Sequence, residues 1–195
     1  MRRVAAERPP VREAERAVKR LFDVAVAAGG LVVAGPLLGA LAALVRLDSR
    51  GPALYRNPRM GRDQRPFTMV KLRTMDDAGR VTRVGRLLRP TGLDELPQLW
   101  HVLIGEMSVV GPRPEVLDRV AGHVARLPHY PERHLMRPGI TGWAQVNGLR
   151  GEASSIPCRL EHDLVYVRTW SLALDARILL GTPAAVWRDL RRTGK

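Results

Sequence analysis

The sequence predicts an α+β protein: a mostly helical domain with short strands, preceded by an N-terminal re-entrant membrane helix hairpin and accompanied by interfacial amphipathic helices. Three observations favour this class. A long uncharged segment lies near the N-terminus, most later segments have helical periodicity, and the strand-like runs are few and short. At 195 residues, the chain is long enough for one domain with its own hydrophobic core.

Composition limits the partners that the chain can have. Hydrophobic residues make up 45% of the chain, which excludes a chain that is disordered throughout its length. Lys and Arg number 32 against 19 Asp and Glu, and the net charge of +13 favours an anionic partner: nucleic acid, lipid headgroups or a phosphorylated substrate. The single cysteine, Cys158, excludes an internal disulfide, and no Cys/His spacing indicates zinc.

The N-terminal region divides into a basic tail and an apolar segment. Residues 1–18 are rich in basic side chains and cannot bury a core. The uncharged run from Val24 to Val45 would reach about 33 Å as one helix, enough for a hydrocarbon core of about 30 Å. Pro36 lies in its middle, where proline removes a backbone hydrogen bond and disturbs the preceding turn. We therefore predict a re-entrant membrane helix over residues 19–48, broken at Pro36.

Charge on both sides of the apolar run supports the re-entrant form. Lys19 and Arg20 precede the run, and Arg46 and Arg50 follow it. Positively charged flanks tend to stay on the cytoplasmic side, which a hairpin satisfies at both ends and a straight span does not. Two alternatives remain open for this run, a buried core helix and a signal peptide.

The next segments carry basic residues at regular spacings. Residues 67–75 predict a strand, and a period of two puts Lys71 and Arg73 on one face, where they would suit a diphosphate. The alternative is a solvated basic strand edge. Residues 81–89 predict a helix with a basic stripe facing phosphates or lipid headgroups, formed by Arg83, Arg86 and Arg89.

The segment from Gly92 to Pro114 is the best candidate for the chemistry. Pro97 is tolerated only in the first turn of a helix, so we expect the helix to begin near Asp94. Asp94 and Glu95 would then lie at its N-terminus, where unpaired N–H groups attract anions. A divalent cation would let one carboxylate and a diphosphate share this place while the other carboxylate attacks phosphorus. The alternative is a pair of acids that complements the helix dipole.

Further along, proline fixes two arginines. Arg113 lies between two prolines and suits bidentate phosphate binding, and Arg137 precedes Pro138 and is a second candidate phosphate ligand. We expect a short strand from Trp143 to Val146. Helices are expected over 115–127, 159–170 and 174–192, the last with the mixed composition of an interfacial helix.

Together, several motifs resemble the bacterial sugar transferases, the small monotopic phosphoglycosyl transferases. They are KRLFD at 19–23, GPALYRNPRMGR, PFTMVKLRTM, TRVGRLLRPTGLDELPQLWHVLIGEMSVVGPRP, RPGITGWAQVNG and the late WSLALDARILL. They occur in order from about Lys19 to the C-terminus. Three positions depart from the usual pattern: Asn57, Gly92 and Glu106.

The resemblance implies an enzyme that moves a sugar-1-phosphate from a UDP-sugar to polyprenyl phosphate, undecaprenyl or decaprenyl, and releases UMP in the first membrane step of surface glycan (exopolysaccharide) synthesis. It implies that Asp94 is the nucleophile and that Glu95 helps to hold Mg²⁺. Lys71, Arg73 and Arg113 would contact phosphates, and we add Arg89 and Arg137 as candidate substrate ligands. Pro36 matches the proline that breaks the membrane hairpin, and we count it among the candidate substrate-binding residues.

The expected organisation is a basic tail (1–18), the membrane helix (19–48) and a catalytic domain (49–195) on the cytosolic face of the inner membrane. The expected partners are the UDP-sugar, the polyprenyl phosphate and membrane lipid, with no nucleic acid. Two alternatives stay open: a basic nucleic-acid-binding protein, against which the aromatic content of 5% argues, and a non-catalytic membrane scaffold. The sugar, the prenyl length, the pathway and a homodimer are left open.

Overall fold

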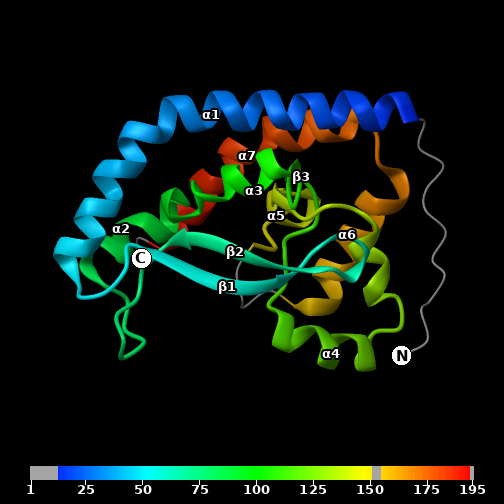
Figure 1. Ribbon diagram of the computed structural model, residues 1–195. Helices are drawn as coiled ribbons and strands as arrows, with labels where there is room; N and C mark the ends of the chain where they lie inside the picture. The colour runs from blue at the N-terminus through cyan, green and yellow to red at the C-terminus, as the bar shows by residue number, and fades with distance from the viewer. Residues whose placement is uncertain (1–12, 151–154, 194–195) are drawn as a thin grey trace.

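The structure is a computed structural model that describes residues 13–150 and 155–193 (Figure 1). Helices dominate it, and the strands form two separate two-stranded sheets. In chain order the elements are α1 (Glu13–Asp48), β1 (Leu54–Met60), η1 (Arg62–Gln64), β2 (Pro66–Leu72), α2 (Arg83–Thr91), η2 (Leu93–Glu95), α3 (Gln98–Ile104), β3 (Ser108–Val110), α4 (Leu117–Arg126), η3 (Tyr130–Leu135), β4 (Gly139–Thr141), α5 (Trp143–Val146), α6 (Ile156–Thr169) and α7 (Leu172–Thr193).

Helix α1 runs along one side of the molecule and bends along its length (Figure 1). The sequence predicted a break at Pro36 into two half-helices, and this is corrected: the helix is continuous from Glu13 to Asp48. Proline removes one backbone hydrogen bond, and a helix of this length accommodates that loss by a bend. Residues 13–18 of the expected tail belong to the helix, and residues 1–12 lie outside the described part of the chain.

Most of the apolar surface of α1 is left uncovered. The helix is long and apolar enough to cross a membrane, and only 11% of its most apolar stretch is buried against the rest of the protein. Val32 and Val33 are largely exposed, whereas Ala27, Leu41 and Val45 pack into the domain. This exposure argues against the core-helix alternative, because a core helix buries most of its surface. The same helix supplies core residues from both of its halves.

The two sheets differ in direction and position. Strands β1 and β2 form an antiparallel hairpin in which Tyr55 pairs with Lys71. The strand predicted over 67–75 is confirmed as far as Leu72. Strands β3 and β4 are short, parallel and buried, and they meet where Gly111 lies against the chain at Arg137. A Cβ on Gly111 would come within 2.3 Å of the Arg137 carbonyl oxygen, so this position requires glycine.

Two local predictions are wrong. Trp143–Val146 is the short helix α5, and the neighbouring strand is β4, Gly139–Thr141. A short apolar run does not distinguish strand from helix by its pattern, and here the tight approach of Gly139 to Gly111 decides which residues pair. The helix expected to begin near Asp94 begins at Gln98, with Pro97 as its N-cap.

The predicted helices at 81–89, 115–127, 159–170 and 174–192 are confirmed as α2, α4, α6 and α7, with shifts of a few residues at their ends. Helix α2 begins at a Thr82 cap whose hydroxyl accepts the Gly85 N–H. It ends at Gly92, whose φ of 72° is left-handed. Gly92 therefore ends α2, and it is also the N-cap of η2, where it supplies no side-chain hydrogen bond.

Three clusters of buried apolar side chains hold these elements together. The largest joins α1, β2, α3, β3, α6 and α7 around Val102, Met107 and Ile178. The second joins the C-terminal half of α1 to β2 and α2 through Leu41, Leu72 and Leu88. Because both clusters include α1, this helix is part of the core although most of its apolar surface is exposed.

Candidate active site

Asp94 lies in a short 3₁₀ turn, η2, between α2 and α3, and its side chain is almost completely buried. Strand β2 brings Lys71 to it, with Lys71 Nζ 3.6 Å from Asp94 Oδ2. Lys71 Nζ also lies 6.0 Å from the centre of the Tyr55 ring on the paired strand. The structure therefore places one buried carboxylate beside one cation, which favours the ionised form of the carboxylate.

The neighbouring carboxylate, Glu95, has a different partner. Arg113 donates from Nη2 to Glu95 Oε1 at 2.5 Å and from Nη1 to Oε2 at 3.3 Å. This is a bidentate pair in which the flanking prolines hold the arginine backbone. This contact joins the two segments that form the site, η2 and the Pro-Arg-Pro turn.

The two adjacent carboxyl groups have pKa values displaced in opposite directions. Burial, followed by the negative charge of Glu95, raises the pKa of Asp94, while Lys71 and Arg113 partly oppose the rise. Burial also acts to raise the pKa of Glu95, but the charge and hydrogen bonds of Arg113 prevail and lower it. Two neighbouring carboxyl groups whose pKa values are displaced in opposite directions are typical of an active site that gives them different roles.

A buried ion pair supports the backbone of the Pro-Arg-Pro turn. Arg133 lies 2.6 Å from Asp163 and donates from Nη2 to the Arg113 carbonyl oxygen at 2.8 Å. Both side chains of the pair are almost fully buried. Since the donated bond ends on the backbone of Arg113, the position of its guanidinium depends on η3 and α6.

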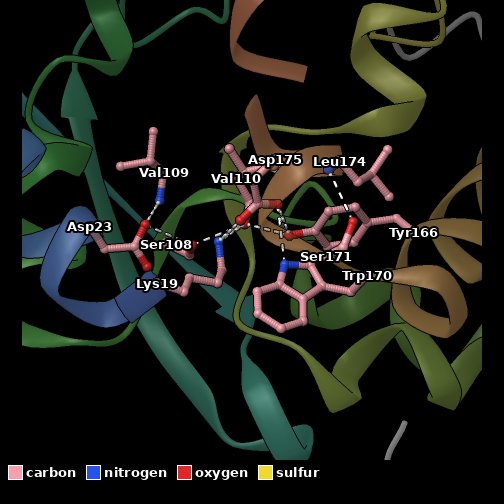
Figure 2. Close-up of polar contacts among 10 residues, drawn as sticks. All are labelled: Lys19, Asp23, Ser108, Val109, Val110, Tyr166, Trp170, Ser171, Leu174 and Asp175. Carbon is pink, nitrogen blue, oxygen red and sulfur yellow. Dashed lines mark hydrogen bonds and ion pairs between the residues drawn. The ribbon is translucent and has the colours of Figure 1, made fainter. Parts of the chain in front are cut away.

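A second polar network lies at the base of the same turn (Figure 2). Lys19 from α1 donates to the Val110 carbonyl oxygen at 3.1 Å and pairs with Asp175 of α7 at 2.7 Å. Tyr166 and Trp170 also donate to Asp175, at 2.8 and 3.2 Å. Val110 immediately precedes Gly111 of the turn, so α1 and α7 hold the strand that leads into it.

Asp23 adds a further tie between α1 and β3. Its Oδ1 accepts from the Ser108 hydroxyl at 3.0 Å and from the Val109 N–H at 2.9 Å. Figure 2 shows Asp23 and Lys19 reaching β3 from the same helix. These are residues of the KRLFD and WSLALD motifs, so the conspicuous motifs at the two ends of the chain meet at one place.

Strand β2 is held to α3 by a buried histidine. His101 Nε2 accepts the N–H of Val70 at 3.0 Å, and its Nδ1 lies 2.6 Å from Glu106 Oε2. His101 therefore has a structural role between β2 and α3. Val70 precedes Lys71, so this contact fixes the strand that carries the cation.

The other predicted ligands lie away from this centre. Arg73 follows the end of β2 and donates to the carbonyl oxygens of Ser49 and Arg50 after α1. Arg89 is on the exposed side of α2, with Nη2 3.6 Å from Met75 Sδ. Arg137 donates to the Gly105 carbonyl oxygen, at the end of α3 opposite the dyad. Pro36 lies in the second half of α1.

Comparison with known proteins places the chain in a family. Residues 14–189 match the family described as bacterial sugar transferase. The chain belongs to this family.

Three similar relatives illustrate its range. The sugar transferase is 43% identical over 185 residues to "UDP-glucose:undecaprenyl-phosphate glucose-1-phosphate transferase" of Xanthomonas campestris pv. campestris, covering 86% of this chain and 38% of that protein. It is 40% identical over 185 residues to "Exopolysaccharide production protein PSS" of Rhizobium leguminosarum bv. phaseoli, covering 85% and 92%. It is 38% identical over 179 residues to "UDP-N-acetylgalactosamine-undecaprenyl-phosphate N-acetylgalactosaminephosphotransferase" of Aeromonas hydrophila, covering 85% and 42%. The chain thus spans about two fifths of the first and third of these relatives.

Two arginines of this sugar transferase join the site without having been singled out from the sequence. Arg150 is close enough to lower the pKa of Glu95 and lies beside Gly92. Arg59 on β1 donates to the Pro114 carbonyl oxygen, and the charge of Arg113 helps to lower its pKa after burial. Arg59 belongs to a motif that carries the family resemblance, and that was the signal that could have found it; Arg150 lies just after the motif that ends at Gly148.

The donor set of the dyad fits a hard divalent cation. Mg²⁺ is usually held by one or two carboxylates together with substrate phosphates and water. Asp94 and Glu95 are adjacent and offer oxygen ligands. Across residues 13–150 and 155–193, no group of three or more His, Cys, Asp or Glu side chains could hold a metal ion. Such an ion would therefore share its coordination with a phosphorylated substrate.

Proposed function

We propose that this sugar transferase moves a sugar-1-phosphate from a UDP-sugar to polyprenyl phosphate through a covalent intermediate on Asp94. The observation that carries the proposal is the division of the dyad: a buried Asp94 beside Lys71, and a Glu95 held by Arg113. The names of the relatives support the donor and the acceptor, which are a UDP-sugar and undecaprenyl phosphate in the Xanthomonas and Aeromonas proteins.

The first step is a displacement at phosphorus. The ionised Asp94 carboxylate attacks the phosphorus that carries the sugar, and an acyl-phosphate bond forms while the bond to the bridging oxygen of the diphosphate breaks. That oxygen leaves with UMP. No proton has to move, because the attacking carboxylate is already charged. Lys71 and Arg113 are placed to offset the charge that develops on the phosphoryl oxygens.

The second step regenerates the enzyme. A phosphate oxygen of the polyprenyl phosphate attacks the same phosphorus, and the bond to Asp94 breaks. The products are a polyprenyl diphosphate-linked sugar and the free carboxylate. Splitting the transfer in this way avoids the need to bring two polyanionic substrates together at once.

Mg²⁺ is the cofactor in this proposal, with Glu95 as its main protein ligand. The ion would offset the negative charge of the diphosphate. Glu95 is bonded to Arg113 at both oxygens. Glu95 would hold the ion only by giving up part of this pairing, and Arg113 would then be free to contact phosphate.

The proposed location is the cytosolic face of the inner membrane, with α1 as a re-entrant anchor. The exposed apolar surface of α1 supports membrane association, and its bend supports a helix that enters and leaves on one side (Figure 1). The product would start a surface glycan. The identity of the sugar is left open, because one relative is named for UDP-glucose and another for UDP-N-acetylgalactosamine.

The experiment uses radiolabelled UDP-sugars with polyprenyl phosphate and Mg²⁺. The native protein is expected to release UMP and label the lipid, and Asp94→Asn is expected to lower both on the order of 10³-fold or more. Asp77→Asn, on the loop after β2, serves as a control with unchanged output. Equal activity of Asp94→Asn and the native protein would remove Asp94 from the mechanism.

A further inference from the structure

A cavity of about 200 Å³ lies next to the dyad, between α3, β4 and α7. Glu95 and Gly92 form part of its lining on the side of η2, and α7 contributes Ala185 and Val186. Most of the lining surface is apolar, and Leu96, Leu99 and Ile140 contribute to it. The proposed chemistry at Asp94 does not by itself require an apolar cavity at this position.

One layer of leucine side chains separates the cavity from the membrane helix. Leu99 lines the cavity, and its Cδ1 lies 3.1 Å from the place where a Cβ on Gly30 of α1 would stand. Leu96 lines it too and packs in the cluster that contains Leu38 and Leu41. Gly30 and Leu38 lie on either side of Pro36. The cavity is therefore behind the bent part of α1, between the lipid-facing helix and the dyad.

The hydroxyl groups around the cavity are already hydrogen-bonded inside the protein. Thr91 donates to the carbonyl oxygens at the end of α2, and Thr182 bonds to the Ile178 carbonyl oxygen and to Thr141 at 2.8 Å each. A sugar or a nucleobase needs several polar groups that remain available to it. Gln145 Oε1 is one such atom: it is buried without a partner in the described part of the chain, and it lies 3.1 Å from where a Cβ on Gly142 would stand. One acceptor atom among apolar walls favours an apolar occupant.

A cation completes the lining beside the dyad. Arg150 lines the cavity, and its Nη2 lies 2.9 Å from the place where a Cβ on Gly92 would stand. Arg150 Nη1 lies 3.8 Å from Asp189 Oδ2, and the two side chains form a loose ion pair. An occupant that is apolar along its length and anionic at its end would match this combination of walls and charge.

We propose that this cavity binds the first isoprene units of the polyprenyl phosphate acceptor, with the phosphate at Arg150. The inference rests on the proposed function and deepens it by assigning the acceptor a site. Lipid leaving the bilayer at the bend of α1 would pass the Leu96–Leu99 wall and bring its phosphate beside Asp94. The donor diphosphate would occupy the side of the dyad that carries Lys71 and Arg113.

Two neighbouring alanines of α7 give a matched pair of variants. Ala185 is buried and lines the cavity, whereas Ala184 is exposed. Ala185→Phe fills the cavity and is expected to raise the KM for polyprenyl phosphate roughly tenfold or more, because the new ring takes the space of an isoprene unit. The release of UMP from the UDP-sugar without acceptor should keep its native rate and amplitude. Ala184→Phe should leave all of these quantities unchanged.

The opposite pattern would overturn the inference. If Ala185→Phe slows UMP release while the KM for the acceptor is unchanged, the cavity belongs to the donor. If neither quantity changes, the cavity binds no substrate. Val186→Phe is a second variant from the same wall, for use if Ala185→Phe unfolds at a lower temperature than the native protein.

A cross-linking experiment on the native protein separates this inference from the proposed function. A short prenyl phosphate with a photoreactive group on its first isoprene units is expected to label peptides that contain Leu96 and Leu99 or Ala185 and Val186. Labels found only elsewhere would contradict the site. Labelling at these peptides in a protein that shows no turnover would keep the site and contradict the proposed reaction.

Discussion

At the scale of single residues, the two carboxylates of the dyad are neighbours in sequence but not in environment. Asp94 is buried with a cation 3.6 Å away, and Glu95 holds an arginine in a bidentate pair. Burial raises the pKa of Asp94, and Lys71 limits that rise. Lys71 therefore helps to keep Asp94, the proposed nucleophile, ionised.

This gives a prediction with a definite sign. The reaction needs ionised Asp94, so the rate falls as the pH drops through the pKa of this group. Lys71→Met removes a charge that lowers the pKa of Asp94, and the acidic limb of kcat/KM for UMP release should move to higher pH. Lys71→Arg keeps the charge and should keep the limb near its native position. A limb that stays in place or moves to lower pH in Lys71→Met would contradict the assignment.

The sequence predicted the residues whose position depends on local rules. Asp94, Glu95, Lys71 and Arg113 were all expected in the site, and the structure brings them together. Arg73 was expected beside Lys71 from the strand period. The strand ends at Leu72, however, and the carbonyl oxygens after α1 bind the Arg73 guanidinium instead. The place of Arg150 depends on how distant segments pack, which no spacing rule describes.

At the scale of elements, the turn that carries Arg113 is held by α1, α6 and α7. Lys19 and Tyr166 both donate to the Val110 carbonyl oxygen at its base (Figure 2). Asp175 accepts from both of these side chains. Helix α1 is thus joined to the site through β3.

Removing Asp175 tests this connection. Asp175→Ala leaves Lys19 buried without its partner, which should lower the free energy of unfolding by about 3–5 kcal/mol. Because the network supports the backbone before Arg113, kcat should fall more than the KM for the donor rises. Unfolding of the detergent-solubilised protein and steady-state kinetics measure both effects. Asp118→Ala on α4 is the control, and the same loss in that variant would show that the effect is not specific to the network.

The bend of α1 is also open to test. Pro36→Ala restores a backbone hydrogen bond donor and should favour a straighter helix that spans the bilayer. In the native protein, tags at the N-terminus and at Lys195 should both be labelled from the cytosolic side. In Pro36→Ala, a fraction of the N-terminal tag should become accessible from outside. Labelling from opposite sides in the native protein would contradict the re-entrant topology, and identical labelling of the two proteins would show that the proline does not decide it.

Elements were predicted well where the pattern was long and poorly where it was short. Helices α4, α6 and α7 follow from an apolar stripe repeated over several turns. Trp143–Val146 was expected to be a strand because its residues favour sheets. It is too short for its pattern to decide, and the packing of β4 against β3 determines its structure.

At the scale of the whole molecule, a basic domain packs against one side of the apolar helix α1 and covers only part of it. The exposed valines of α1 and the net charge of +13 together fit a protein seated at an anionic lipid surface. A nucleic-acid-binding protein would share the charge but would not need the uncovered helix.

Extraction from membranes distinguishes a protein at a lipid surface from a nucleic-acid-binding protein. Membranes washed with high salt should retain the protein, because burial of the apolar face of α1 does not depend on ionic strength, and detergent should release it. Val32→Asp combined with Val33→Asp places charge on this exposed face and should increase the salt-released fraction. Complete release of the native protein by salt alone would contradict the membrane anchor.

The most direct test of the central claim is the mass of the intact protein after incubation with UDP-sugar and Mg²⁺ in the absence of acceptor. The account predicts an added mass of one sugar-phosphate, located on Asp94 by peptide mapping and lost when polyprenyl phosphate is added. UMP release that occurs only when both substrates are present, with no added mass on the protein at any time during turnover, would contradict it.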